Sequence, residues 1–380
     1  MNLCRRLVCV GRLSSISSCP LSTFDFDSAA VNELAHKLGG GSRAALAQSI
    51  TMVESRNARK RHAGNVLLQK MLNLARQKMV EFGPETSLIF RIGISGAPGA
   101  GKSTFIENFG MKLVRDMNKR LAVLCIDPSA HTSGGQLQSA SPIQRTFGGS
   151  ILGDMTRMTE LSRHPHAFIR QSPTHGALGG VARGTHDAVV LCEGAGYDIV
   201  FIETVGVGQS EVAVTDMVDM FILLISPGQG DELQGFKRGI MELCDLIVVT
   251  KADGELSSKA KLAQAEYMSA LKYLHPRSNN WTPQVLRASA LTGEGLDDIW
   301  SCMQRFRAKM LQSGELQTRR DRQLSMWMWR YVQDELTQRF VRQPKVAEMV
   351  SQYEIDIRRG ALTPGMAADQ LLDTFFGHQS

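Results

Sequence analysis

Residues 96–103 read GAPGAGKS and match the pattern GxxxxGK[ST] at every fixed position. An apolar run over 91–95 precedes the pattern, and apolar residues at helical spacing follow it, at Phe105, Ile106 and Phe109. Glycines here let backbone N–H groups converge on phosphate oxygens, and the start of a helix adds partial positive charge. The alternative, a glycine-rich turn without a ligand, is disfavoured by this strand–loop–helix context. We therefore expect a nucleotide-phosphate site formed by Gly96, Ala97, Pro98, Gly99, Ala100, Gly101, Lys102, Ser103 and Thr104.

Two side chains of this loop have distinct expected tasks. The Lys102 ammonium of such a loop reaches the β- and γ-phosphates of a nucleoside triphosphate. The Ser103 hydroxyl completes the oxygen shell of a Mg²⁺ ion. The loop by itself does not distinguish an ATPase from a GTPase.

Short apolar runs alternate with helix-length spacers on both sides of the loop. The runs are nearly continuous in apolar residues, which suits buried strands of a parallel sheet covered on both faces. They lie at 88–94, 121–126, 198–202, 220–225, 246–249 and 284–286. We predict an α/β fold, a P-loop NTPase with a doubly wound, mostly parallel sheet. The expected segments are N-terminal helices over 25–85, the P-loop nucleotide-binding domain over 86–305 and a C-terminal helical arm over 306–380.

Composition restricts the class of protein. The 380 residues are 43% hydrophobic and 21% charged, which is ordinary for a globular protein. No apolar run approaches the roughly 18 residues that a membrane helix needs. The formal net charge of +6 is too mild for a dedicated nucleic-acid binder. The sequence therefore predicts neither a membrane nor a nucleic acid as partner.

Residues 1–24 carry arginine and serine but no acidic residue. This composition is typical of a mitochondrial transit peptide, and Arg12 interrupts the apolar core that a secretory signal needs. A disordered N-terminal tail is the open alternative. We expect the mature chain to begin near Asp25 and to be located in the mitochondrial matrix.

Residues 250–253 read TKAD and follow directly after the strand predicted at 246–249. They are similar to the NKxD signature of GTPases, in which the aspartate accepts hydrogen bonds from N1–H and N2–H₂ of guanine. Adenine has no such donor pair, so a buried carboxylate would stay unpaired beside it. Thr250 departs from the signature's asparagine, so selectivity depends more on the aspartate. A second segment, Ser289-Ala290-Leu291, follows another predicted strand and looks like the backbone clamp for guanine O6. Each of the two segments alone would also fit a strand-end turn, but their order after the phosphate loop favours guanine. The expected base contacts are Lys251, Asp253, Ser289, Ala290 and Leu291.

Four further stretches resemble one group of GTPases: IDPS (126–129), GGSILGD (148–154), ETVGVGQ (203–209) and GQGDELQG (228–235). Together they resemble the metallochaperone-like GTPases that include nickel-insertion proteins. The longer strings resemble specifically the methylmalonic aciduria type A family and its bacterial MeaB-like counterparts, from about Ala29 to the C-terminus. This resemblance implies a Mg²⁺-dependent GTPase that is a chaperone of adenosylcobalamin-dependent methylmalonyl-CoA mutase. Such a chaperone gates cofactor loading and protects or reactivates the mutase, and the cobalamin adenosyltransferase is a further partner to expect.

The resemblance also implies roles for individual residues. Glu203 takes the Walker B position, where a carboxylate holds Mg²⁺ through water. Asp127 and Asp154 match acidic positions of the first switch, although Asp127 also fits a turn residue before Pro128. Gly206 matches the second-switch glycine that senses the γ-phosphate, and 228–239 matches a third mobile segment that contacts the partner. The expected metal ligands are Ser103, Asp127, Asp154 and Glu203, and the expected catalytic residues are Lys102, Glu203 and Gly206.

The first switch departs from the family pattern. Residues 136–149 look like a 14-residue insertion between the TSGG run at 132–135 and the following SILGD. A flexible loop tolerates such length, since each doubling costs only about 0.6 kcal/mol. The insertion nevertheless puts the metal role of Asp154 in doubt.

Val207 occupies the position at which small signalling GTPases place a glutamine that orients the attacking water. We therefore expect slow intrinsic hydrolysis of GTP to GDP and phosphate, accelerated when the mutase orders the switches. A nickel-insertion chaperone is the main alternative, but the histidines are dispersed and no CxxC pair exists. A kinase of small basic amino acids ranks lower because no base for a substrate hydroxyl is identifiable.

The C-terminal arm carries aromatic residues at 327, 329 and 331 beside Met328. In the resembled family this element dimerises, and we expect a homodimer. Packing of the same side chains within one chain is the alternative, because aromatic anchors serve both purposes.

Overall fold

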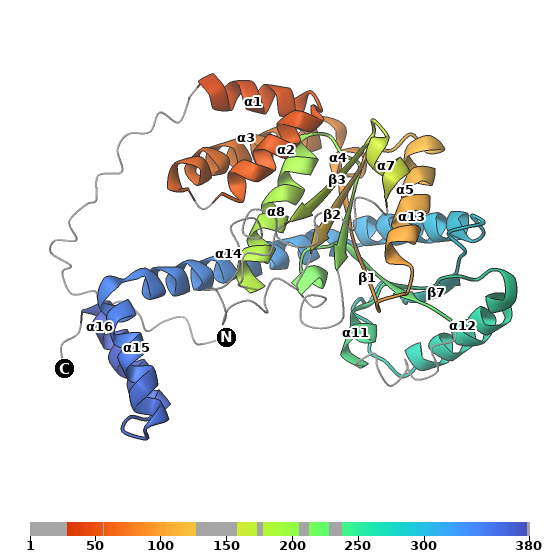
Figure 1. Ribbon diagram of the computed structural model, residues 1–380. Helices are drawn as coiled ribbons and strands as arrows, with labels where there is room; N and C mark the ends of the chain where they lie inside the picture. Colours follow the sequence, from red (N-terminus) through yellow and green to blue (C-terminus); the bar gives the residue numbers. More distant parts are fainter. Residues whose placement is uncertain are drawn as a thin grey trace.

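The computed structural model describes residues 29–55, 57–126, 158–172, 178–204, 213–227 and 238–377. At its centre is a seven-stranded sheet, ordered β3-β2-β4-β1-β5-β6-β7, in which every pairing is parallel (Figure 1). The strands are β1 (Phe90–Gly96), β2 (Leu121–Ile126), β3 (Ala167–Ser172), β4 (Ile199–Thr204), β5 (Met220–Ile225), β6 (Leu246–Val249) and β7 (Gln284–Arg287). Strands β1, β2, β4, β5 and β6 are buried along their whole length, as their apolar runs predict. The predicted α/β fold class is confirmed.

Strand β3 was not predicted. It forms one edge of the sheet and pairs only with β2. Its Arg170 and Gln171 break the apolar run that marks the central strands. An edge strand does not need a fully apolar sequence, because one side of it is not covered by a neighbouring strand. Arg170 instead forms an ion pair with Glu54 of the N-terminal helices, with 2.5 Å between Nη2 and Oε2.

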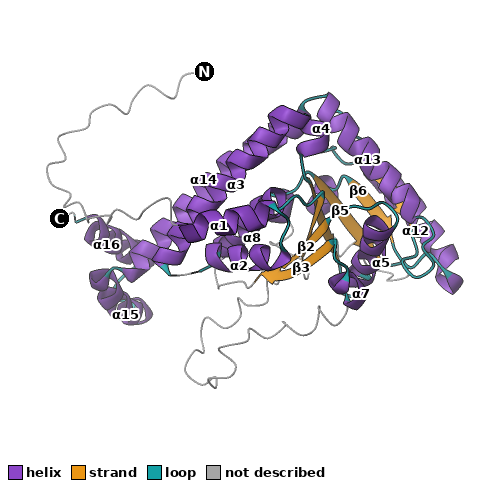
Figure 2. Ribbon diagram, turned by 90° about the horizontal axis from the view of Figure 1, so that it is seen from above, coloured by secondary structure: helices purple, strands orange, loops and turns teal. Residues whose placement is uncertain are grey.

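Helices cover both faces of the sheet (Figure 2). One core cluster joins the sheet to α1 (Ala29–Gly39), α2 (Arg43–Val53), α3 (Ala58–Phe82), α8 (Leu178–Gly194), α11 (Arg238–Leu243) and α12 (Ser257–Leu271). The other joins it to α5 (Lys102–Arg115), α7 (Thr159–Arg163) and α13 (Leu296–Gln312). Short α4 (Pro84–Ser87) and the 3₁₀ turn η2 (Gly254–Leu256) complete the body. In β2, β4, β5 and β6, the side chains that point to alternate faces therefore enter two separate cores.

Helix α14 (Glu315–Arg342) runs along the body and out of it, carrying α15 (Pro344–Arg358) and α16 (Pro364–Phe376) at its far end (Figures 1 and 2). Arg320 anchors the helix, donating to both carboxylate oxygens of Asp219 at 2.8 and 2.6 Å and to the Ile89 carbonyl at 2.6 Å. Burial alone would raise the pKa of Asp219, but the Arg320 guanidinium holds that pKa below its ordinary value. The arm is thus fixed to the amino end of the sheet by a buried, hydrogen-bonded ion pair.

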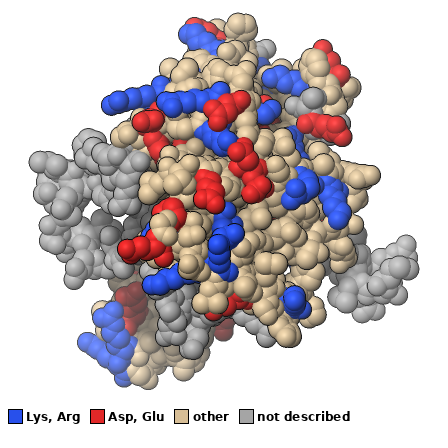
Figure 3. Space-filling model, turned by 90° about the vertical axis from the view of Figure 1, so that its right-hand side faces the viewer, with Lys and Arg blue, Asp and Glu red and all other residues tan. Residues whose placement is uncertain are grey.

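The surface carries mixed charge. Figure 3 shows one face on which the basic and acidic side chains of the described residues are interspersed rather than gathered into a basic stripe. Within the described ranges, no helix has both the length and the hydropathy needed to cross a membrane.

Candidate nucleotide-binding site

The GxxxxGK[ST] loop joins the end of β1 to the start of α5, beside the middle of the sheet. Gly99 and Gly101 have φ of +85° and +84°, a backbone conformation that favours glycine. At Gly96 a Cβ atom would lie 2.4 Å from the Leu224 carbonyl oxygen of the adjacent strand β5. The three glycines are therefore required by the path of the loop itself.

Lys102 and Ser103 lie in the first turn of α5. The Lys102 ammonium donates to the Gly96 carbonyl at 2.7 Å and to the Ala97 carbonyl at 3.2 Å, so it lies across the loop. The first N–H groups of a helix have no partner within the helix, and they give its start a partial positive charge. The loop therefore presents an ammonium, a hydroxyl and a helix start to one anion.

The segment after β6 is fastened to the phosphate loop. The single proton of the Thr250 hydroxyl is shared between the carbonyls of Ala100 (2.7 Å) and Ile225 (3.0 Å), both of which lie within hydrogen-bond distance. Lys251, with φ of +54°, donates from Nζ to the Gly99 carbonyl at 2.8 Å. Threonine, in place of the usual asparagine, thus holds the loop by its hydroxyl. The two segments expected to contact phosphate and base are adjacent in the structure.

Asp253 and Ser289 come from different loops and meet directly. The Ser289 hydroxyl donates to Asp253 Oδ2, and it accepts a hydrogen bond from the Thr292 N–H at 3.1 Å. The backbones of the two loops are also joined, since the Ala252 N–H donates to the Ala288 carbonyl at 3.2 Å. Next to Ser289, Ala290 is half-buried and Leu291 is exposed. The predicted base-contacting residues therefore form one site, with the aspartate carboxylate oriented by the serine.

Glu203 lies at the end of β4, buried, with 2% of its surface exposed. It pairs in register with Ile94 of β1 and Cys125 of β2, and both of these pack in the same core as α5. Glu203 therefore faces the side of the sheet on which Ser103 begins α5. Carboxylate and hydroxyl oxygens are ligands that Mg²⁺ prefers, so this donor set fits the ion directly or through water.

Three predicted site residues lie outside the described residues: Asp127, Asp154 and Gly206. The same holds for the 136–149 insertion, for Val207 and for most of 228–239. Three polar residues that the sequence analysis did not single out lie near Glu203: Cys125, which contacts its carboxylate, Thr204, which follows it in the chain, and Ser95, which accepts a hydrogen bond from Thr204. Their signal in the sequence is a polar residue at the end of an otherwise apolar strand.

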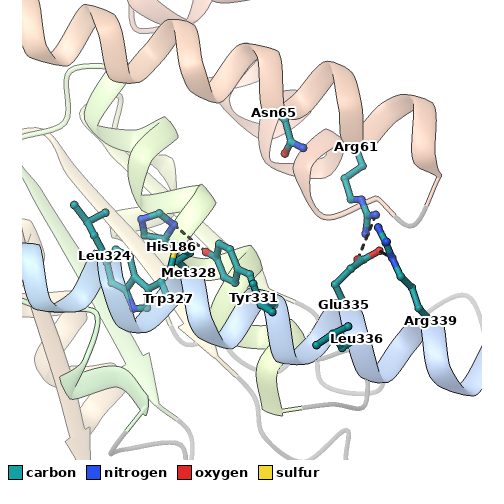
Figure 4. A pocket seen from close by; sticks show the side chains of 11 residues that line it. Arg61, Asn65, His186, Leu324, Trp327, Met328, Tyr331, Glu335, Leu336 and Arg339 are labelled. Atoms are coloured by element: carbon teal, nitrogen blue, oxygen red, sulfur yellow. Dashed lines mark hydrogen bonds and ion pairs between the residues drawn. The ribbon is translucent and has the colours of Figure 1, made fainter. Parts of the chain in front are cut away.

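A cavity of about 630 Å³ lies between α3, α8 and α14, apart from the phosphate loop (Figure 4). His186 of α8 is at its inner end, 2.9 Å from the Tyr331 hydroxyl and with its ring centroid 3.9 Å from that of Trp327. Burial lowers the pKa of His186 below its ordinary value. Trp327 is therefore packed within the chain, whereas Met328 and Trp329 are 53% and 62% exposed. For Trp327, packing within one chain, the alternative considered from the sequence, is therefore what the structure shows.

Comparisons with known proteins agree with this geometry. The model of the family described as "Methylmalonyl Co-A mutase-associated GTPase MeaB" matches residues 46–345. The "Methylmalonic aciduria type A homolog, mitochondrial" of Caenorhabditis elegans is 52% identical over 93% of this chain and 84% of its own length. The "GTPase ArgK" of Escherichia coli is 39% identical over 90% of this chain and 96% of its own length. A solved LAO/AO transport system kinase is 33% identical, covers 92% of this chain and 98% of its own, and superimposes with a TM-score of 0.67. The chain therefore belongs to the MeaB family of methylmalonyl-CoA mutase-associated GTPases and hydrolyses GTP.

Proposed function

We propose that this GTPase depends on Mg²⁺ and is a chaperone of adenosylcobalamin-dependent methylmalonyl-CoA mutase. In this role it gates the loading of intact cofactor and protects or reactivates the mutase. The observation that carries the proposal is the Asp253 carboxylate, oriented by Ser289 beside a phosphate loop to which its own segment is fastened. The family description and the names of the relatives support the mutase as partner.

The guanine base is selected at Asp253. Its carboxylate accepts from N1–H and N2–H₂ of guanine, while Ser289, Ala290 and Leu291 present backbone to O6. Lys251 lies between the base segment and the phosphate loop, through its bond to Gly99. Adenine would leave the carboxylate unpaired at a cost of about 1–3 kcal/mol or more.

The phosphates are held by the loop amides from Gly96 to Thr104 and by the Lys102 ammonium. Ser103 and Glu203 would hold Mg²⁺, with Asp127 and Asp154 as further ligands. When bound, the ion would supply positive charge that stabilises the phosphate oxygens. Lys102 lies across the loop at the same end and stabilises charge on the β–γ bridging oxygen. Gly206 completes the catalytic group as the γ-phosphate sensor, and the valine at 207 keeps turnover by the isolated chain slow.

We also propose that the chain is a mitochondrial matrix homodimer. Residues 1–24 serve as the transit peptide, in agreement with the word "mitochondrial" in the name of the worm relative. The exposed apolar side chains of α14 give the arm a surface suited to a second copy of the chain; they are Leu324, Met326, Met328, Trp329, Val332, Leu336 and Val341. Several of them line the cavity of Figure 4. The cobalamin adenosyltransferase is the expected donor of the cofactor.

The test is transfer of adenosylcobalamin to cofactor-free mutase, followed by absorbance, with the full chain present. We expect loading with GTP and arrest with a non-hydrolysable GTP analogue. Loading that proceeds identically with GTP, with the analogue and without the chain would overturn the chaperone role.

A further inference from the structure

We propose that Ser95 and Thr204 are a positioning pair that holds the Glu203 carboxylate on the α5 side of the sheet, and that Cys125 orients the same carboxylate from the neighbouring strand. The inference rests on the proposed role of Glu203 at the metal ion. It assigns tasks to three buried polar residues, of which Thr204 belongs to the ETVGVGQ stretch and Ser95 directly precedes the phosphate loop. The three lie at the carboxyl ends of β1, β2 and β4, which are adjacent in the sheet.

The side chains of Glu203 and Thr204 point to opposite faces, because successive residues of a strand alternate. Glu203 shares its face with its register partners Ile94 and Cys125, which belong to the core that includes α5. On the other face, the Thr204 hydroxyl donates to the Ser95 hydroxyl at 3.0 Å. The hydrogen bond of Thr204 on one face therefore fixes the strand backbone from which the Glu203 carboxylate projects on the other face.

Both hydroxyls are completely buried, at 0% exposure. A buried hydroxyl without a partner is costly, so each one restricts the other to this geometry. Ser95 directly precedes Gly96, the first glycine of the phosphate loop, and Thr204 directly follows Glu203. The hydrogen bond therefore joins the segment that binds phosphate to the segment that supplies the metal carboxylate.

Cys125 acts on the carboxylate itself. Its thiol donates to Glu203 Oε2, with 3.5 Å between sulfur and oxygen, and is itself only 2% exposed. A hydrogen bond from a neighbouring residue restricts the rotation of a carboxylate. Residues that orient metal ligands in this way typically change metal affinity by about 10–100-fold when they are removed.

The experiment measures Mn²⁺ binding to the GDP-loaded full chain by electron paramagnetic resonance, with GDP affinity in EDTA measured alongside. We expect Thr204→Val and Ser95→Ala each to weaken Mn²⁺ binding about tenfold without changing GDP affinity in EDTA. The conservative Thr204→Ser should bind Mn²⁺ as the wild type does. Ser49→Ala is the matched control, because it removes an equally buried hydroxyl that donates to the Ala45 carbonyl of α2.

The double variant Thr204→Val/Ser95→Ala distinguishes two coupled hydroxyls from two independent losses of Mn²⁺ affinity. If the two hydroxyls act as one unit, the double variant loses no more than either single variant. A loss near the product of the two single losses would overturn the pairing. Wild-type Mn²⁺ affinity in Thr204→Val would overturn the inference altogether.

The thiol is tested in the same assay. Cys125→Ala should weaken Mn²⁺ binding, and Cys125→Ser, which keeps a donor at this position, should bind Mn²⁺ as wild type does. Cys244→Ala is the control and should have no effect, because it removes a buried thiol that is hydrogen-bonded to the Ile240 carbonyl. Equal affinities in Cys125→Ala and wild type would exclude the orienting role.

Glu203→Gln tests the proposed metal site separately from the positioning role. If it binds Mn²⁺ as wild type does, the proposed metal site itself is wrong; if it weakens binding while Thr204→Val does not, only the positioning role is wrong.

Discussion

Replacing Asp253 with asparagine should reverse the base preference of the site. The carboxylate of Asp253 is oriented by the Ser289 hydroxyl, which donates to one of its oxygens. Guanine offers two donors to this carboxylate, and a hydrogen bond to a charged group is worth about 1.5–3 kcal/mol. Asparagine keeps one acceptor but places an amide donor against a guanine donor. We therefore expect GDP affinity to fall by roughly 10²–10³-fold, which corresponds to about 3–4 kcal/mol.

Xanthosine diphosphate should gain what GDP loses, because xanthine carries a carbonyl at C2 where guanine carries its amino group. The Asp253→Asn amide donates to that carbonyl. Isothermal titration calorimetry of the full chain with GDP, xanthosine diphosphate and ADP measures all three affinities. Ser289→Ala, which removes only the orienting hydroxyl, should weaken GDP about tenfold without this reversal. GDP affinity within threefold of wild type in Asp253→Asn, or no gain for the xanthine nucleotide, would refute the reasoning.

Arg320→Met should lower the free energy of unfolding by about 3–5 kcal/mol in urea denaturation, because it leaves Asp219 buried without this partner. The Arg330–Asp216 pair is partly exposed, so Arg330→Ala should lower the free energy of unfolding by less than about 1 kcal/mol. An equal effect of both variants would contradict this account of the anchor. The pKa of Asp219 is held below its ordinary value of 3.8, so the stabilisation by this carboxylate is complete above that pH and is lost as the pH falls further. The free energy of unfolding of wild type should therefore fall more steeply with pH below 3.8, and that of Arg320→Met should not. Trp329→Asp should shift the chain from dimer to monomer in light scattering at micromolar concentration, and a dimer of unchanged stability would remove α14 from the interface. Deletion of residues 136–149 should leave GDP affinity within about threefold, as the low cost of loop length predicts, and a loss of binding would show that the insertion is part of the site.

Much of the nucleotide site can be predicted from the sequence because its determinants are local. The glycine positions follow from backbone conformation, as the positive φ of Gly99 and Gly101 shows. The central strands are continuous apolar runs for the simple reason that both of their faces are covered. The break before α2 is equally local, with Gly41 at φ of +80° and Ser42 accepting from the Ala45 N–H.

What the sequence does not predict depends on contacts between distant residues. The polar sequence of α14 indicates an exposed arm, yet Arg319 and Arg320 are buried because Asp245 and Asp219 lie opposite them. These acidic partners are 74 and 101 residues away along the chain. In the same way, the sequence does not decide whether Trp327 packs at an interface or within the chain, and its contact with His186 of α8 decides for the second.

GTP turnover by the full chain, measured at steady state without and with methylmalonyl-CoA mutase, tests the central claim most directly. We predict slow turnover by the chain alone and a clear acceleration when the mutase is added. Turnover that is fast in the isolated chain, and unchanged by the mutase, would contradict a GTPase coupled to that partner.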